Sequence, residues 1–449
     1  MEDKEKTLIS DLCEFLDHSP TSFHACDNMQ KALEREGFVT LSEAEPWRLV
    51  PSGRYVVTRN RSSLIAFQMP EAEKASGFQI VASHSDSPMF KIKEHEELTV
   101  KDHYVQLDVE PYGGMIMSSW FDRPLTVAGR VVVMTDEGIE TRLVRFDDCT
   151  AVIPNVAIHM NREVNKGYEY RANVDLLPLF GDIRTRGAFR KLLAERAGVA
   201  PDRILGHDLY LCNAMKSQVW GQRQEYISSA RLDNLECAFC SCAAILQAGH
   251  TQAVQMVAVF DNEEVGSTTK QGADSTFLSD VMRRIATALG EGEEGYQRML
   301  ASSMMLSADN AHATHPNHPE YSDPVNLAYM NEGIVIKFNA RQKYTSDAVS
   351  EGLLHWILQK AGVKVQHYAN RSDMPGGGTL GNISGSHVSI QTVDIGLAQL
   401  AMHSAWETAG TGDVEEMVRG MTAFFNTGIR AGKDGNFELT PAEAGTDAP

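Results

Sequence analysis

The stretch VASHSDSP, residues Val81–Pro88, begins as an apolar strand and ends in a cluster of polar side chains. His84 and Asp86 follow the apolar part and stand two residues apart. A second stretch, AVFDNEEVGS at Ala258–Ser267, repeats the pattern and ends in two adjacent glutamates. Because the carboxyl ends of parallel strands meet at one edge of an open α/β sheet, these two endings predict a shared site.

Apolar runs alternate with helical stretches along most of the chain. In the helical stretches Thr276–Leu289 and Ser346–Lys360, apolar residues recur about one turn apart. This alternation predicts an α/β fold, a three-layer αβα sandwich around a mostly parallel mixed sheet. The strands are expected at Phe78–His84, Val254–Asn262, Ser302–Asn310, Gly333–Asn339 and Val388–Gly396.

Residues 94–221 have a different character from the rest of the chain. They contain short β-like runs such as RVVVMTDEG and TRLVRF, and little helix before GAFRKLLAERAG. A chain of 449 residues is also too long for one typical core. We therefore expect residues 94–221 to form an inserted, mainly-β domain, with residues 1–93 and 222–449 making up one discontinuous main domain.

Composition restricts the classes of partner and compartment. The net charge of −19 argues against nucleic acid or an anionic membrane as a partner. No run of about 18 apolar residues predicts a membrane span. The charged N-terminal stretch is expected to be an amphipathic helix and not an export signal, and the seven cysteines are an odd number. We therefore expect a reducing compartment, the cytoplasm, and a frayed tail from Thr440 onward.

Three closely spaced cysteines, Cys237, Cys240 and Cys242, have the look of a zinc cluster. No second CxxC exists to complete a four-sulfur site. Free cysteine is among the residues most often buried, so we expect these three to pack inside a buried helix.

Six residues that suit divalent metals stand near predicted strand ends or helix starts. An isolated acid there is usually a helix cap or a solvated turn residue, and only the joint pattern favours a site. Histidine nitrogen and carboxylate oxygen both bind zinc. Two ions roughly 3.5–4 Å apart need a bridging carboxylate and terminal ligands on each side. The six residues are His84, Asp233, Glu263, Glu264, Asp309 and His403.

The same segments resemble the aspartyl aminopeptidase family of dinuclear zinc metallopeptidases, which includes vacuolar aminopeptidase I of yeast; the chain is similar to its bacterial-type members. The resemblance covers nearly the whole chain and is carried by seven motifs in the family's order. They are SHSDSP, IPNVAIHMNR, RLDNL, DNEEVGS, SADNAHATHPN, GIVIKFN and LAMHS.

The resemblance implies a role for each metal-ligating residue. His84 and Asp309 would be terminal ligands of one zinc, and Glu264 and His403 ligands of the other. Asp233 would be the bridging carboxylate. Manganese and cobalt remain alternatives to zinc, because these metals share nitrogen and oxygen ligands.

Three further residues receive roles from the resemblance. Glu263 would be the general base. Asp86 would orient the His84 ring and set its tautomer. Lys337 would meet the acidic side chain of the substrate's first residue, although a structural lysine at a strand end is the alternative.

The resemblance also points to residues around the substrate. His159, in the inserted domain, would reach the active site of a neighbouring subunit. His312 and His315 match histidines close to the site, with roles left open. Gly377 and Gly378 belong to the run MPGGGTLG, which we interpret as a backbone turn lining the substrate pocket; a plain flexible loop is the alternative.

These expectations together describe a metal-dependent aminopeptidase that releases Asp or Glu from peptides with a free N-terminus. The family implies a large homo-oligomer, a dodecamer built from dimers, with the inserted domain mediating self-association. Broader or neutral specificity, a related dinuclear deacylase or carboxypeptidase, and a non-catalytic scaffold are the alternatives. Retention of all five ligands and the base argues against the scaffold.

Overall fold

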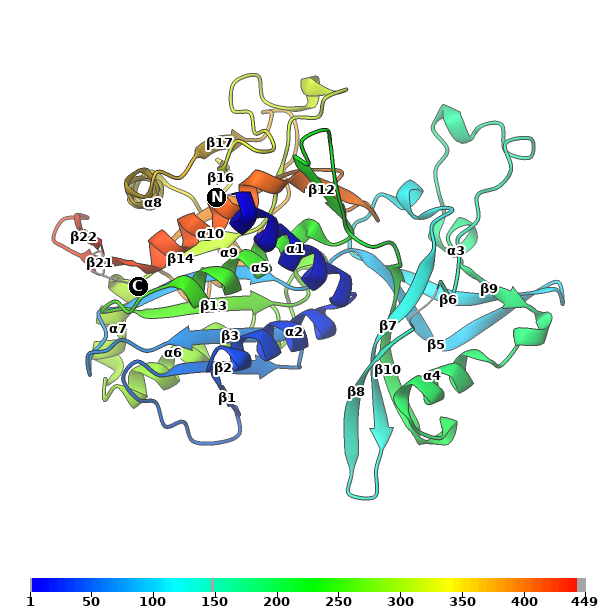
Figure 1. Ribbon diagram of the computed structural model, residues 1–449, viewed down its shortest axis with the longest axis horizontal. Helices are drawn as coiled ribbons and strands as arrows, with labels where there is room; N and C mark the ends of the chain where they lie inside the picture. Colours follow the sequence, from blue (N-terminus) through cyan, green and yellow to red (C-terminus); the bar gives the residue numbers. More distant parts are fainter. Residues whose placement is uncertain (1, 147–148, 442–449) are drawn as a thin grey trace.

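The structure is a computed structural model that describes residues 2–146 and 149–441 (Figure 1). A nine-stranded sheet forms the body of the molecule, and a six-stranded sheet projects to one side of it. A third sheet of five short strands and a two-stranded hairpin complete the fold. None of the described helices is both long enough and apolar enough to cross a membrane.

The nine-stranded sheet is parallel at its centre and mixed toward its edges. Its order is β1-β2-β3-β13-β4-β14-β18-β16-β17, and β13, β4, β14 and β18 run parallel to one another. β3 pairs antiparallel with β13, and β16 pairs antiparallel with β18. The strands are β1 (Val39–Leu41), β2 (Arg54–Arg59), β3 (Ser63–Gln68), β4 (Phe78–His84), β13 (Val254–Phe260), β14 (Met304–Ala308), β16 (Ile334–Phe338), β17 (Val365–Ala369) and β18 (Gln391–Gly396).

Helices cover both faces of this sheet, because successive side chains of its central strands point to opposite sides. In β4, Val81 packs in one hydrophobic cluster, and Ile80 and Ala82 pack in another. The first cluster includes α1 (Glu2–His18), α2 (Ser22–Arg35), α5 (Leu232–Gln247), α8 (Ala348–Ala361) and α10 (Thr411–Phe425). The second includes α6 (Phe277–Ala288), α7 (Glu293–Ala301) and α9 (Leu380–Ser384). The expected three-layer α/β architecture is confirmed.

The six-stranded sheet is antiparallel and has a hydrophobic core of its own. Its order is β8-β7-β10-β5-β6-β9. The strands extend from Met89 to Asn213, so the sheet starts before residue 94 and ends before residue 221. Its elements are β5 (Met89–Val100), β6 (Tyr104–Tyr112), β7 (Leu125–Met134), β8 (Ile139–Arg145), β9 (Leu179–Asp182), β10 (Ile204–Asn213), α3 (Ala172–Asp175) and α4 (Phe189–Ala197). The expected mainly-β character is confirmed.

The five-stranded sheet, in the order β11-β12-β20-β19-β15, was not expected from the sequence. Its strands are β11 (Gln218–Trp220), β12 (Tyr226–Ser229), β15 (Ala311–His312), β19 (Ala398–Leu400) and β20 (Glu407–Gly410). The hairpin pairs β21 (Thr427–Ala431) with β22 (Phe437–Pro441); the rest of the tail expected to fray lies outside the described residues. Short 3-10 turns are η1 (Met117–Trp120), η2 (Val164–Lys166), η3 (Ile183–Thr185), η4 (Pro201–Arg203), η5 (Glu263–Val265) and η6 (Pro319–Tyr321).

The elements expected from the sequence are present where the hydrophobic pattern is strongest. The five predicted strands correspond to β4, β13, β14, β16 and β18, and the helices predicted at Thr276–Leu289 and Ser346–Lys360 correspond to α6 and α8. The expected N-terminal helix is α1, and the expected cysteine-bearing helix is α5. Gly362 ends α8 in the left-handed conformation, with φ 65°. Cys237, Cys240 and Cys242 lie within α5 and are buried in the main hydrophobic core, as expected.

Candidate metal centre

Three adjacent parallel strands end at the same edge of the large sheet and carry polar residues there. His84 is the last residue of β4, and its register partner is Phe260, the last residue of β13. Asp309 follows the end of β14. After β13, Asn262 adopts φ 63°, and this turn leads into η5, which holds both glutamates. The apolar strands therefore bring the polar stretches of the sequence to one place.

Asp233, near the start of α5, lies between two histidines. Its Oδ1 is 3.4 Å from Nε2 of His84, and its Oδ2 is 3.4 Å from Nε2 of His403. Each carboxylate oxygen therefore faces a different imidazole. This is the arrangement that a bridging carboxylate requires.

Each histidine also faces a second carboxylate. Nε2 of His84 is 3.6 Å from Oδ1 of Asp309. On the other side, Nε2 of His403 is 3.2 Å from Oε2 of Glu264. Two groups result, which share Asp233 and which each bring three ligand atoms within 4.8 Å of one another.

The spacing of these atoms fits a metal better than direct hydrogen bonding. A strong hydrogen bond to a carboxylate spans about 2.7–2.9 Å, whereas the four separations here are 3.2–3.6 Å. Ligands about 2.0–2.2 Å from a tetrahedral zinc lie roughly 3.3–3.6 Å from one another. The side chains are therefore spaced as ligands of a shared ion would be.

Unsatisfied buried oxygens and excess negative charge give independent support for a cation at this position. Oδ1 of Asp233 and Oε1 of Glu264 are buried and have no hydrogen-bond partner among the described residues. Burial and the charge of Asp233 raise the pKa of Glu264 well above its usual range. Burial alone would raise the pKa of Asp233, but His403 and His84 hold it below its usual range. Divalent cations would satisfy both oxygens and neutralise this charge.

Asp86 holds several parts of the centre together. Nδ1 of His84 donates to the main-chain oxygen of Asp86 at 3.1 Å, and the Asp86 carboxylate is 3.4 Å from the same nitrogen. With Nδ1 directed at Asp86, Nε2 is left to face Asp233 and Asp309. The predicted contact with His84 is present, with the main-chain oxygen as the nearer acceptor.

The Asp86 carboxylate also fixes the turn that carries the two glutamates. It accepts hydrogen bonds from the backbone N–H groups of Glu263 at 3.1 Å and Glu264 at 3.2 Å. These bonds hold η5 against the end of β4, so that both glutamate side chains lie close to the His84 ring. The two adjacent glutamates therefore lie at the same site, as their predicted roles of base and ligand need.

Tyr112, at the end of β6, is a site residue that the sequence did not indicate. Its hydroxyl donates to the Asp86 carboxylate at 2.7 Å and accepts from Nδ2 of Asn262 at 2.8 Å. Tyr112 pairs with Met89, the first residue of β5, which follows directly on the SHSDSP stretch. The inserted domain is thus attached to the centre at its base.

Glu407, four residues after His403, is a second residue that the sequence did not indicate. Its carboxylate is buried and accepts from the backbone N–H groups of His403 at 2.8 Å and Asp233 at 3.1 Å. Burial, followed by the charge of Asp233, raises the pKa of Glu407 to about 8. In the sequence, only its closeness to His403 could have indicated that Glu407 belongs to the site.

Glu263 has the surroundings expected of a proton carrier. Burial raises its pKa to about 8, against the opposing charge of His84 and with the repulsion of Asp309 and Asp86 adding to the rise. It lies beside His84 and Glu264, within 4.8 Å of both at its nearest carboxylate oxygen. A buried carboxylate beside the candidate ligands is placed to accept and return a proton.

Lys337, the predicted contact for an acidic substrate, is almost fully buried on β16. Its Nζ donates to the main-chain oxygen of Asp309 at 2.7 Å and lies 5.1 Å from the Tyr344 ring centroid. The lysine therefore fixes the backbone of a candidate ligand. Its contact with substrate remains a prediction, and the alternative of a structural lysine gains support.

The other predicted substrate residues lie at the surface and remain predictions. His159 is exposed in the inserted domain. His312 is exposed on β15, with its ring 6.3 Å from that of Tyr368. His315 accepts from the backbone of Asn317 and faces solvent. Gly377 and Gly378 lie in an exposed loop, and a Cβ at Gly377 would meet open space, so close packing does not require glycine there.

Comparison with known proteins gives one consistent group of relatives. A family model described as aminopeptidase I zinc metalloprotease (M18) matches residues 15–425. The "Probable M18 family aminopeptidase 2" of Clostridium acetobutylicum is 42% identical over 422 residues, which cover 92% of this chain and 98% of that protein.

Solved structures agree over the same length. A chain from the cryo-EM structure of the Ape4 and Nbr1 complex matches with TM-score 0.91 and 34% identity, covering 94% of this chain and 86% of that one. The mApe1 dodecamer of S. cerevisiae matches with TM-score 0.82 and 26% identity, covering 94% of this chain and 97% of that one.

Proposed function

The chain belongs to the M18 family of aminopeptidase I zinc metalloproteases, and from this membership we propose that it releases N-terminal Asp or Glu from peptides at a dinuclear metal centre. Metal-dependent aminopeptidase activity follows from the family itself. The two-metal centre, the acidic preference and the residue roles are the proposal.

The observation that carries the proposal is the position of Asp233 between two histidines. His84 and Asp309 would hold one divalent ion, His403 and Glu264 would hold the other, and Asp233, which faces both histidines, would be shared between them. Zinc is the metal proposed, because nitrogen and oxygen ligands suit it and the family is named for it.

The chemistry divides between the bound ions and the protein. Bound divalent ions supply Lewis-acid polarisation of the scissile carbonyl and lower the pKa of water from about 15.7 toward about 7. Glu263 takes a proton from the attacking water on a carboxylate oxygen and delivers it to the leaving amine. Asp86 keeps η5 in place while Glu263 changes charge, because it holds the backbone and not the reacting carboxylate.

The acidic preference rests on Lys337, and its burial favours a second candidate, an aminopeptidase of broader specificity. Nζ of Lys337 donates to the main-chain oxygen of Asp309, so the ammonium lies next to a proposed metal ligand. An ammonium in that position attracts an acidic side chain at longer range. Two of its three N–H donors face the main-chain oxygens of Asp309 and Asn310, and a direct ion pair would need a substrate carboxylate to reach a lysine that is only 1% exposed.

A panel of Asp-, Glu-, Leu- and Lys-aminoacyl substrates separates the two specificities. Acidic preference predicts Asp and Glu turnover at least tenfold above Leu in kcat/KM. It also predicts that Lys337→Gln lowers Asp turnover more than Leu turnover. Equal rates for Leu and Asp in the unmodified protein would leave the broader aminopeptidase as the function.

Self-association through the inserted domain is the second part of the proposal. His159 lies among exposed apolar side chains in a surface segment of that domain: Val156, Ile158 and Met160 are 53%, 49% and 83% exposed. Exposed apolar groups in one segment mark an interaction surface. We propose that His159 reaches the metal centre of a neighbouring subunit, in a dodecamer built from dimers.

The compartment proposed is the cytoplasm. All seven cysteines are free, and Cys237, Cys240 and Cys242 serve as packing residues in the main core. Such cysteines suit a reducing environment. Fractionation of cells that produce the protein tests this assignment, and recovery with an exported fraction would overturn it.

A further inference from the structure

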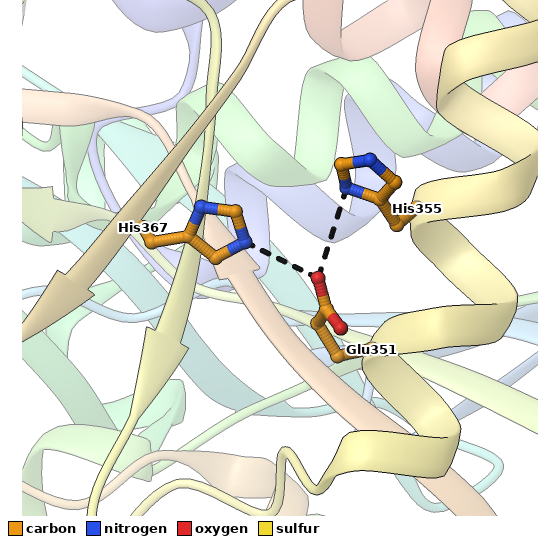
Figure 2. A group of neighbouring side chains, drawn as sticks. All are labelled: Glu351, His355 and His367. Carbon is orange, nitrogen blue, oxygen red and sulfur yellow. Dashed lines mark hydrogen bonds and ion pairs between the residues drawn. The ribbon is translucent and has the colours of Figure 1, made fainter.

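A second group of metal-ligating side chains lies on the outer edge of the large sheet, away from the centre described above. Glu351 and His355 stand one helical turn apart on α8, and His367 lies on the edge strand β17 (Figure 2). One atom from each, a carboxylate oxygen or a ring nitrogen, lies within 4.8 Å of the other two. β17 is three strands from β14, roughly 14 Å at about 4.8 Å per strand.

The side chains converge in the way that a three-ligand metal site requires. Oε1 of Glu351 is 3.2 Å from Nε2 of His367 and 3.7 Å from Nδ1 of His355. Figure 2 shows both imidazoles turned toward this one oxygen. Ligands of a tetrahedral zinc are roughly 3.3–3.6 Å apart, so both separations are within a few tenths of an ångström of that range.

The scaffold holds the group in place from both sides. The i, i+4 spacing puts Glu351 and His355 on the same face of α8. The Phe338 ring, on the neighbouring strand β16, stacks on His367 with centroids 6.0 Å apart. The two imidazoles are nearly parallel, with centroids 6.3 Å apart and an interplanar angle of 24°. The two ring nitrogens lie within 4.8 Å of each other, so they need to approach by at most about 1.5 Å to reach the spacing of two ligands on one ion.

We propose that Glu351, His355 and His367 form a separate surface site for a divalent transition metal such as Zn²⁺, independent of the dinuclear centre. Two imidazole nitrogens and one carboxylate oxygen select such metals over Mg²⁺ or Ca²⁺, which prefer oxygen. A bound ion ties α8 to the edge strand β17 and leaves one coordination position open to solvent.

Zinc stoichiometry of the metal-loaded protein tests the site. Wild-type protein and the His355→Ala variant are dialysed against the same buffered Zn²⁺ and analysed for bound metal. The wild type is expected to hold one more equivalent per chain than the variant, and the difference does not depend on how many ions the dinuclear centre holds. Alanine favours the helix and His355 is exposed, so α8 stays folded.

The matched control is His387→Ala, which removes an imidazole that faces a single carboxylate, that of Asp274. It should retain the extra equivalent, and added Zn²⁺ should raise the unfolding temperature of wild type and control above that of His355→Ala. Equal zinc content in wild type and His355→Ala overturns the proposal. Loss of the same equivalent in His387→Ala also overturns it, because the binding would then belong to surface histidines in general.

Discussion

At the scale of single residues, the position of Asp233 determines how the centre can work. One carboxylate that faces two imidazoles through different oxygens can hold two ions, and the other ligands then divide between them. Glu264 and Glu263 are neighbours in the chain but differ in surroundings. Both lie near His84, and Glu264 also faces His403. Ligand and base can therefore come from adjacent positions.

Replacing Glu263 with glutamine should stop the reaction without emptying the centre. Glutamine has the same shape but cannot take the proton of the attacking water, so kcat should fall about 10²- to 10⁴-fold. Steady-state kinetics and metal analysis on the same sample check this. An active variant that keeps its metals would remove Glu263 from its proposed role.

Tyr112 belongs to the inserted domain, and replacing it with phenylalanine should lower the metal affinity or the activity of the centre. The change removes the hydroxyl bonded to Asp86 and Asn262, and loss of such an outer contact costs about 10-fold in activity or metal affinity. Zinc affinity and kcat measure the effect. Tyr210→Phe, whose ring packs edge-on 5.6 Å from Tyr112, is the control and should behave as wild type. Equal loss in both variants would mean that packing, and not the hydroxyl, matters.

Among the helices and strands, the hydrophobic pattern predicted the positions of the long buried elements. The run FQIVASH is buried at every position and forms β4 over the predicted residues. The five-stranded sheet was missed because its strands are two to four residues long and too short for a periodic pattern. β16 runs antiparallel to β18, a direction that apolar runs alone cannot reveal.

The residues proposed as ligands could be picked out from the sequence, but the residues that support them could not. The proposed ligands stand in polar motifs near strand ends or helix starts, and the fold brings them together. Tyr112 and Glu407 support the site through contacts with distant segments, the first reaching Asp86 from another domain. Lys337 stands in a motif, but only the fold shows that its ammonium is turned to the main chain of Asp309.

Glu236 in α5 should make the protein less stable as the pH rises. Its carboxyl group is fully buried, and burial raises its pKa to about 8. The pKa of this carboxyl is higher in the folded protein than in the unfolded chain, where it is about 4.3. The group therefore contributes its full stabilisation below about pH 4.3, and this contribution is lost as the pH rises to about 8. Linkage limits the loss to roughly 5 kcal/mol.

The variant Glu236→Gln stays neutral and should lose less stability over the same interval. Unfolding temperatures measured from pH 5 to pH 9 check this, with Glu438→Gln, an exposed glutamate, as the control. Parallel curves for Glu236→Gln and wild type would show that Glu236 does not titrate in this range.

For the molecule as a whole, the inserted domain is proposed to connect catalysis to assembly. Its base contacts the centre of its own chain through Tyr112, and its surface segment around His159 is proposed to reach a neighbour. His159→Ala should keep the oligomer mass in light scattering and lower kcat at least tenfold, because the lost group is the one proposed to touch the neighbour's substrate. A fully active monomer would contradict both the assembly and the role of His159.

Release of the N-terminal residue is proposed to depend on one pair of divalent ions that share Asp233. To test this, all metal is removed from the protein with a chelator. Release of Asp from an Asp-peptide is then measured as Zn²⁺ is returned in known equivalents per chain. Activity should be absent without metal, should rise with the first two equivalents, and should stay near zero throughout in Asp233→Asn, which removes the bridge. Full activity of the metal-free protein, or wild-type activity of Asp233→Asn at two equivalents, would contradict it.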